Sequence, residues 1–256
     1  MIRYIPADPA GNLTAIVLSP VAAQDRAKIA AEMMARCPEG FEQVGFADET
    51  SLTGDLPTLC MMGGEFCGNA TRAFACYAAK VRGRGETRLA VSVSGAREPV
   101  PVAVDLRQNR AYAQMPLPYA LEWISVNKQK IPLVRMEGID HALLLDAAPS
   151  PEAAERVLAA MPKQDARGVL FVQGGKMTPL VEVAATGTRV WESSCGSGTV
   201  ALAWYLAQNL ADGMHAFAFD EPGGRLEVRV AMRAGRAAQI EMGGAVKLGE
   251  EAEIEL

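Results

Sequence analysis

The stretch EFCGNATRAFACYAAK, residues 65–80, places a cysteine directly before Gly-Asn at the start of an Ala-rich segment with helical character. The stretch SSCGSGTVALAWYLAQ, residues 193–208, repeats this arrangement. Counted from Cys67 and from Cys195, seven of the first fourteen residues are identical, and the offset of 128 residues is half the length of the 256-residue chain. A repeat at half the chain length predicts an internal duplication.

Other landmarks recur in the same order. GNLTAIVLS (11–19) is echoed by GIDHALLLD (138–146) at an offset of 127, and GAREPVPVAV (95–104) by GGRLEVRVAM (223–232) at an offset of 128. Apolar residues at helical spacing over 22–36 predict an early helix in the first half, as 151–161 does in the second. Two copies are too few for a solenoid, so the pattern predicts two similar α/β lobes with a cleft between them.

The best candidate for a linker is the segment around Pro116 and Pro118, because neither proline can continue a regular element. We therefore expect an N-terminal lobe over 1–117 and a C-terminal lobe over 118–256. The tail, about 246–256, is expected to pack back on the first lobe.

The composition argues against several classes of function. A net charge of −5, with a pI near 5.3 and no basic block, disfavours nucleic acids and anionic membranes as partners. No apolar run reaches the roughly 18 residues of a membrane span, and the N-terminus lacks a signal-peptide core, so we expect a cytoplasmic protein. The five cysteines include no CxxC pair and the two histidines are far apart, which predicts free thiols and no metal site.

Each cysteine precedes small residues at a helix start: Gly68-Asn69 in the first copy and Gly196-Ser197-Gly198-Thr199 in the second. A helix N-terminus offers unpaired N–H donors and the positive end of the dipole, which suits a carboxylate ligand. The same field predicts a lowered pKa for the thiol. Neither turn has the lysine of a phosphate-binding GxxxxGK[ST] loop.

Two such turns on either side of a small carboxylate ligand would place its α-carbon between two sulfur atoms. One thiolate could remove the α-proton while the other thiol delivers a proton to the opposite face, which inverts the stereocentre by general acid–base catalysis. This scheme needs no cofactor. The other cysteines, Cys37, Cys60 and Cys76, are interpreted as packing residues, and His141 as a hydrogen-bonded structural residue.

At this point the sequence resembles the diaminopimelate epimerase superfamily of cofactor-independent amino-acid racemases. CGNAT and CGSGT are similar to its two cysteine motifs, and the resemblance extends over the whole chain through PAGN (9–12), EQVGF (42–46), VSG (93–95), QMP (114–116), WESSCGSGT (191–199) and EPGG (221–224). The set is most similar to the histidine racemases of opine-type metallophore biosynthesis. The resemblance implies an α/β (α+β) fold whose two pseudo-symmetric lobes each wrap a mostly antiparallel sheet or barrel around a central helix.

The resemblance also implies roles for single residues. Cys67 and Cys195 match the catalytic thiols. The positions that match substrate-binding residues are Asn12, Glu42, Gln43, Gly68, Asn69, Glu192, Gly196, Ser197, Gly198 and Thr199. No cofactor or metal is implied, and the partner is a small amino-acid substrate. The sequence leaves a homodimer open.

Departures from diaminopimelate epimerase argue against its substrate. The epimerase has an arginine where this chain has Ser193, and its GNPH motif is GIDH here. A distal carboxylate would lack a cationic partner, so histidine is the leading substrate. The alternatives are diaminopimelate or another basic amino acid, a phenazine-biosynthesis-like isomerase of the same fold, and a non-catalytic amino-acid-binding module.

Overall fold

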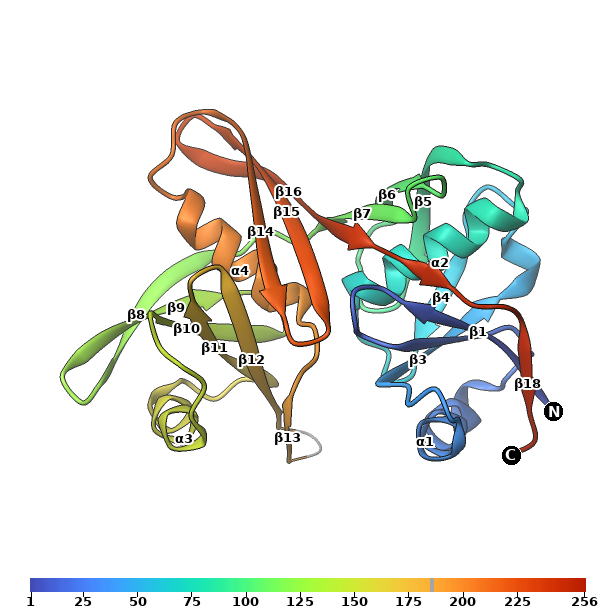
Figure 1. Ribbon diagram of the computed structural model, residues 1–256, viewed down its shortest axis with the longest axis horizontal. Coiled ribbons are helices and arrows are strands. Elements are labelled where there is room, and N and C mark those ends of the chain that lie inside the picture. The colour runs from blue at the N-terminus through green and yellow to red at the C-terminus, as the bar shows by residue number, and fades with distance from the viewer. Residues whose placement is uncertain (185–186) are drawn as a thin grey trace. The chain divides into compact units, whose positions relative to one another are not determined.

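The computed structural model describes residues 1–184 and 187–256, which divide into two units (Figure 1). Unit 1 comprises Met1–Gln114 and Gly243–Leu256, and unit 2 comprises Met115–Met242. Both are mixed α/β structures in which strands outnumber helices. Across the described residues, no helix has both the length and the apolar character to span a lipid bilayer.

Unit 1 is a sheet joined by two α-helices. Its strands are β1 (Ile2–Asp8), β2 (Thr14–Val17), β3 (Gln43–Asp48), β4 (Thr58–Met61), β5 (Glu86–Val93), β6 (Val100–Asp105), β7 (Arg110–Met115), β17 (Lys247–Leu248) and β18 (Ala252–Ile254), and its helices are α1 (Arg26–Arg36) and α2 (Gly68–Val81). Strand β16 (Arg236–Ala245) runs from unit 2 into unit 1 and pairs with β7. The next strands, β17 and β18, pair with β1. The C-terminal segment therefore pairs with both the first strand of unit 1, β1, and the last of the N-terminal run, β7.

The sheet of unit 1 is mostly antiparallel, with two parallel pairs. Strands β2 and β3 are parallel and are connected through α1, while β4 and β5 are parallel and are connected through α2. Parallel neighbours need a crossover connection, which a helix supplies. The sequence places a helical segment at both of these positions.

Helix α2 is buried along nearly its whole length, from Gly68 to Ala79. Small residues around its circumference allow strands to pack against every side, which is the expected state of a helix without a polar face. The chain leaves the helix at Gly83, whose φ of 64° is the left-handed conformation common just after a helix end.

Strand β2 separates the two cores of unit 1. Ile16 packs in the cluster around α2, whereas Ala15 and Val17 pack in the cluster around Met33 of α1. Alternate side chains of a strand point to opposite faces, so one short apolar run supplies both cores. In Figure 1, α1 and α2 accordingly lie on opposite sides of this sheet.

Unit 2 repeats this organisation. Its strands are β8 (Ala120–Val126), β9 (Gln129–Arg135), β10 (Ile139–Leu145), β11 (Ala166–Gln173), β12 (Lys176–Val183), β13 (Thr188–Trp191), β14 (Gly213–Glu221), β15 (Gly224–Arg233) and most of β16, and its helices are α3 (Pro151–Ala160) and α4 (Gly196–Ala207). Helix α3 begins at Ser150, whose hydroxyl accepts a hydrogen bond from the Ala153 N–H, with Pro151 in the first turn.

The order of strand pairing is the same in the two units. In unit 1, β1–β2 is antiparallel, β2–β3 parallel, β3–β4 antiparallel, β4–β5 parallel and β5–β6 antiparallel. In unit 2, β9–β10, β10–β11, β11–β12, β12–β14 and β14–β15 follow the same alternation. Helices α2 and α4, each preceded by a candidate cysteine, occupy the same place in this order.

The expected early helices differ slightly from those observed. The first begins with a short 3-10 turn over Ala23–Asp25 before α1, and the second ends at Ala160. Strands β8 and β9 form a hairpin. Strand β9 occupies the place of β1 in the order of pairing, whereas the repeat did not indicate β8.

Candidate active site

Cys67 is the N-cap residue of α2, with an extended backbone at φ −127° and ψ 113°. Its sulfur accepts a hydrogen bond from the Ala70 N–H at 3.4 Å. The Thr71 hydroxyl and the Thr71 N–H both donate to the Cys67 carbonyl, at 2.7 Å and 2.9 Å. Gly68 and Asn69, the first helical residues, are buried. Thus the sulfur lies at the positive end of a buried helix, in a turn closed by a threonine.

A network of amide side chains adjoins this turn. Gln43 donates from Nε2 to Asn12 Oδ1 at 2.6 Å and to Thr14 Oγ1 at 2.8 Å. Asn69 donates from Nδ2 to the same Asn12 oxygen at 3.3 Å. The Gln43 side chain also acts to lower the pKa of the Cys67 thiol. Three predicted binding residues from the 9–12 turn, β3 and α2 therefore lie together beside the first cysteine.

Arg72 holds this network in place through hydrogen bonds in the core. Its side chain is fully buried and donates to Asn69 Oδ1 at 2.9 Å, to the Pro9 carbonyl at 3.1 Å and to the Ala245 carbonyl at 3.4 Å. Because the guanidinium offers only donors, it turns the Asn69 oxygen toward itself and the Asn69 NH₂ toward Asn12. These hydrogen bonds connect the start of α2 to the PAGN turn and to the end of β16.

Glu42 lies on the surface at the edge of the network. Its side chain is exposed, and Oε2 accepts a hydrogen bond from Asn12 Nδ2 at 2.9 Å. The backbone N–H of Glu42 donates to the Leu13 carbonyl at 2.9 Å, which places the residue just before β3. One carboxylate oxygen is thus held by Asn12 and the side chain is open to solvent.

Cys195 occupies the matching position in unit 2, as the N-cap of α4, with φ −118° and ψ 97°. The Thr199 hydroxyl donates to the Cys195 carbonyl at 2.7 Å, the same bond that Thr71 makes in unit 1. Gly198 lets this helix start pack closely, because a Cβ at that position would lie 2.8 Å from a Leu170 methyl group and 3.2 Å from the Cys195 sulfur. Gly196, the first helical residue, is half-buried.

Two carboxylates flank the second cysteine. Glu221, at the end of β14, accepts a hydrogen bond from the Cys195 N–H at 2.6 Å and lies 2.5 Å from the Thr199 hydroxyl. Glu192 is half-buried, and its carboxylate acts to raise the pKa of the Cys195 thiol. The second helix start is therefore more negative than the first, where amide and backbone N–H groups approach the sulfur.

His141 extends the second site into the core. It is fully buried on β10, and its Nε2 lies 2.9 Å from the Ser197 hydroxyl, which is 3.6 Å from the Cys195 sulfur. Gly168 makes room for the imidazole, since a Cβ there would lie 2.1 Å from Nδ1. Burial lowers the pKa of His141 to about 3, so the ring is neutral at ordinary pH.

The expected lowering of the thiol pKa is wrong for both cysteines. Burial raises the pKa of Cys67, although the Ala70 N–H and the Gln43 side chain act in the opposite direction. Burial, followed by the charges of Glu192 and Glu221, raises the pKa of Cys195 well above its ordinary value. The free energy needed to remove a thiolate from water exceeds the stabilisation that the field of the helix start gives to the thiolate.

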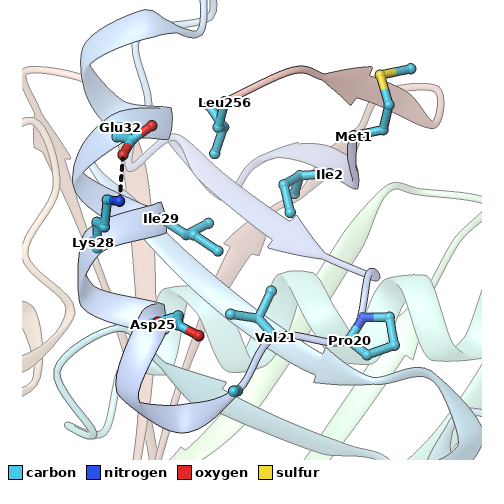
Figure 2. Close-up of a pocket in the computed structure, with 10 residues that line it drawn as sticks. Met1, Ile2, Pro20, Val21, Asp25, Lys28, Ile29, Glu32 and Leu256 are labelled. Atoms are coloured by element: carbon cyan, nitrogen blue, oxygen red, sulfur yellow. Dashed lines mark ion pairs between the residues drawn. The ribbon is translucent and has the colours of Figure 1, made fainter.

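The part of the chain that the structure describes contains no group of three His, Cys, Asp or Glu side chains arranged to hold a metal ion. A surface hollow of about 330 Å³ lies elsewhere in unit 1 (Figure 2). Its apolar lining includes Ile2, Val21, Ile29 and Leu256, and the Lys28–Glu32 ion pair spans 3.9 Å at its side. None of the predicted site residues lines it.

Sequence reasoning assigned no role to three residues that contact the two turns: Thr71, Arg72 and Glu221. Thr71 and Thr199 are identical in the repeat, and that identity was a usable signal. Glu221 lies in the quoted EPGG motif, but nothing in the motif indicates that the carboxylate reaches Cys195. The interpretation of His141 as a hydrogen-bonded residue agrees with its contact to Ser197.

The family model described as the histidine racemase CntK N-terminal domain matches residues 1–254 of the chain. The chain belongs to this histidine racemase family. It is an isomerase that acts on amino acids. A histidine racemase from Fusobacterium nucleatum subsp. nucleatum is 31% identical over 221 residues, which cover 80% of this chain and 81% of that protein. A histidine racemase from Staphylococcus aureus is 26% identical over 241 residues, covering 89% and 88%.

Solved structures of low sequence identity share the fold. A probable proline racemase from Agrobacterium radiobacter has a TM-score of 0.66 at 14% identity, covering 100% of this chain and 93% of that one. A putative phenazine biosynthesis PhzC/PhzF protein from Clostridium difficile has a TM-score of 0.68 at 13% identity, covering 100% of each chain. These similarities concern the architecture alone.

Proposed function

We propose that this protein interconverts the enantiomers of an amino acid, with histidine as the substrate, by a two-base mechanism in which Cys67 and Cys195 act on opposite faces of the α-carbon. The observation that carries the proposal is the matched pair of helix starts. Each cysteine caps a largely buried helix of small residues, and each turn is closed by a threonine hydroxyl donating to the cysteine carbonyl at 2.7 Å.

In this mechanism one cysteine begins as thiolate and the other as thiol. The thiolate takes the α-proton, the α-carbon becomes planar, and the second thiol gives its proton to the opposite face. Afterwards the two protonation states are exchanged. The raised thiol pKa values suit this task, because a thiolate of higher pKa is a stronger base toward a weakly acidic C–H.

The substrate carboxylate is assigned to the backbone N–H groups at the two helix starts. Gly68 and Asn69 in the first turn, and Gly196, Ser197 and Gly198 in the second, carry small or no side chains. N–H groups at a helix start favour an anion, and they also stabilise the charge that develops on the carboxylate as the α-proton leaves. Asn12 and Gln43 complete the binding surface on the first side.

The preference for histidine rests on family membership and on Glu42. A carboxylate can accept a hydrogen bond from an imidazole N–H, and Glu42 keeps its side chain exposed while Asn12 holds one oxygen. Glu192 supplies a second carboxylate near Cys195. Ser193, in place of the epimerase arginine, supports a substrate without a distal carboxylate, so diaminopimelate is disfavoured.

We also propose that the two units arose by duplication and that both act on one substrate molecule. The repeated sequence landmarks and the repeated order of parallel and antiparallel pairs support a common origin. A planar carbanion needs equivalent groups on its two faces, which gives the duplication a chemical reason.

Exchange of the α-proton in D₂O separates an enzyme from a binding module. Incubated with L-histidine in D₂O, the protein is expected to introduce deuterium at the α-carbon, seen as loss of the α-proton NMR signal, while optical rotation falls to zero. Diaminopimelate and lysine serve as comparison substrates. Binding of histidine without exchange would favour the amino-acid-binding module, and faster exchange of diaminopimelate would favour the epimerase.

Replacement of either thiol tests the two-base mechanism. Cys67→Ser and Cys195→Ser are each expected to abolish racemisation, because a hydroxyl is a far weaker acid than a thiol. Cys60→Ser is the matched control, since Cys60 is half-buried and lies outside both helix starts. Near-normal turnover in Cys67→Ser or in Cys195→Ser would contradict the two-base mechanism.

A further inference from the structure

A buried carboxylate at the second helix start has no counterpart at the first. In unit 2, Glu221 is 7% exposed, and its two oxygens contact the Cys195 N–H at 2.6 Å and the Thr199 hydroxyl at 2.5 Å. The Thr199 hydroxyl is also 2.7 Å from the Cys195 carbonyl, so its single proton is shared between two acceptors. A carboxylate thus caps the turn that carries the second cysteine.

The repeat provides an internal comparison. The offset of 128 residues that relates Cys67 to Cys195 also relates Val93 to Glu221, and these are the last residues of the matching strands β5 and β14. Val93 is buried in the core around α2. The bond from Thr71 to the Cys67 carbonyl nevertheless forms at 2.7 Å. A carboxylate is therefore not needed to close this type of helix start.

We propose that Glu221 holds Cys195 in the thiol form in the free enzyme, so that Cys195 begins the reaction as the acid and Cys67 as the base. Glu221 would be a positioning residue, since it acts through the peptide and sulfur of Cys195 and not on substrate. The assignment of starting roles to the two thiols rests on the proposed two-base function, whereas the protonation of Cys195 does not.

The surroundings of the two sulfurs support this division. The side chains that act on the Cys195 sulfur include Glu192, Glu221 and Ser197, and the His141 beyond Ser197 is neutral. Both carboxylates disfavour a second negative charge on the sulfur. Around Cys67 the backbone N–H groups of Ala70 and Asn69 and the Gln43 amide favour the thiolate. Glu65 is the opposing carboxylate there and has the smallest effect.

Glu221→Gln separates charge from structure. The glutamine oxygen can accept from the Cys195 N–H, and its NH₂ group can donate to the Thr199 hydroxyl, which then donates to the Cys195 carbonyl. The hydrogen bonds of this side chain to Cys195 and Thr199 are kept, whereas its charge is lost. Glu221→Val gives unit 2 the residue that unit 1 has, and Glu182→Gln removes a carboxylate that pairs with Arg167 and Arg189 in the same unit.

The test measures the alkylation rate of Cys195 by iodoacetamide as a function of pH, with the modified peptide quantified by mass spectrometry, in the absence of substrate. In Glu221→Gln the rate below the titration midpoint is expected to rise at least about tenfold, which corresponds to a pKa lower by one unit. The rate at Cys67 and the rates in Glu182→Gln should not change. The alkaline limb of the racemisation profile should move to lower pH.

An unchanged Cys195 profile in folded Glu221→Gln would overturn the proposal and leave Glu221 as a structural cap. If Glu221→Val fails to fold, the glutamine variant still decides the matter, because it keeps the hydrogen bonds. The thiol titration needs no turnover, so failure of the racemase proposal and failure of this inference give different results. If the protein lacks racemase activity but Glu221→Gln still shifts the alkylation profile of Cys195, only the racemase proposal is contradicted.

Discussion

Single side chains in unit 1 are oriented by one another before any ligand arrives. Arg72 orients Asn69, Asn69 and Gln43 both donate to Asn12, and Asn12 donates to Glu42. Amide groups held in this way lose little conformational freedom on binding, which favours a defined ligand geometry. Glu42 differs from the others because its side chain is exposed and free to accept a further bond.

The role of Glu42 can be tested by its effect on different substrates. Glu42→Gln is expected to lower kcat/KM for histidine, which corresponds to a loss of roughly 1.5–3 kcal/mol of transition-state stabilisation, because a charge-assisted bond to the imidazole N–H is lost. The loss should be smaller for an apolar amino acid, which never used the carboxylate. Equal losses for both substrates would mean that Glu42 supports the Asn12 network without selecting the ligand.

His141 should make the stability of the protein depend on pH. Its pKa is about 3 in the folded state and about 6.5 in the unfolded chain, so the unfolded state binds more protons between these values. Stability is therefore lost as pH falls from about 6.5 toward 3, by up to about 1.4 kcal/mol per pH unit.

Urea denaturation at pH 7 and pH 5 measures this effect. The parent protein is expected to lose about 2 kcal/mol more than His141→Gln between the two pH values, since glutamine does not titrate. His215→Gln is the control, because His215 is half-buried with Nε2 2.7 Å from the Ala211 carbonyl. Identical pH dependence in the parent and His141→Gln would contradict a buried neutral imidazole.

A glycine allows the hairpin of β5 and β6 to approach the start of α2 closely. The turn after β5 brings Gly95, with φ 73°, against the segment that leads into Cys67, and a Cβ there would lie 2.3 Å from the Phe66 nitrogen. The VSG motif therefore fixes how closely a hairpin approaches the start of α2. The position of the first thiol depends on this contact between two elements as well as on the helix.

Gly95→Ala should displace the start of α2. The left-handed backbone costs about 1–2 kcal/mol for a residue with a Cβ, and the backbone clash adds to it. Gly83→Ala is the matched control, because Gly83 has φ 64° and no atom within 4 Å of the added Cβ. We expect Gly95→Ala to lose more stability in urea and more kcat than Gly83→Ala. Equal effects would show that the approach of the hairpin does not matter.

At the scale of the whole molecule, each unit carries its own complete helix start. Cys67 with its amide network belongs to unit 1, and Cys195 with Glu192 and Glu221 belongs to unit 2. Neither unit alone has a second thiol at a helix start in the described residues. The proposed inversion therefore needs both units, which distinguishes it from a binding function that one unit could perform.

Oxidation tests whether the two thiols reach the same place. If both act on one carbon, mild oxidant without substrate is expected to link Cys67 to Cys195 and abolish activity, and dithiothreitol should restore it. Peptide mapping detects the link, and histidine added beforehand should protect. Inactivated protein without this cross-linked peptide would mean that the sulfurs do not approach each other.

Much of the architecture follows from the sequence because its signals are local. Ala-rich, proline-free stretches after two cysteines form α2 and α4, continuous apolar runs form β2 and β10, and an alternating apolar run forms β15. The repeat at half the chain length also indicates that both helix starts occupy equivalent places in the order of elements. These inferences depend on periodicity and identity within a few residues, which a sequence displays directly.

The tertiary structure alone decides which distant groups surround each sulfur. Glu221 is 26 residues from Cys195 and Gln43 is 31 residues from Asn12, and only strand pairing brings them within hydrogen-bond distance. Burial likewise reversed the expected direction of both thiol pKa values, because desolvation depends on what packs around a group and not on its neighbours in sequence. The sequence determined that two cysteines begin two equivalent helices; packing determined that they begin them in opposite electrostatic surroundings.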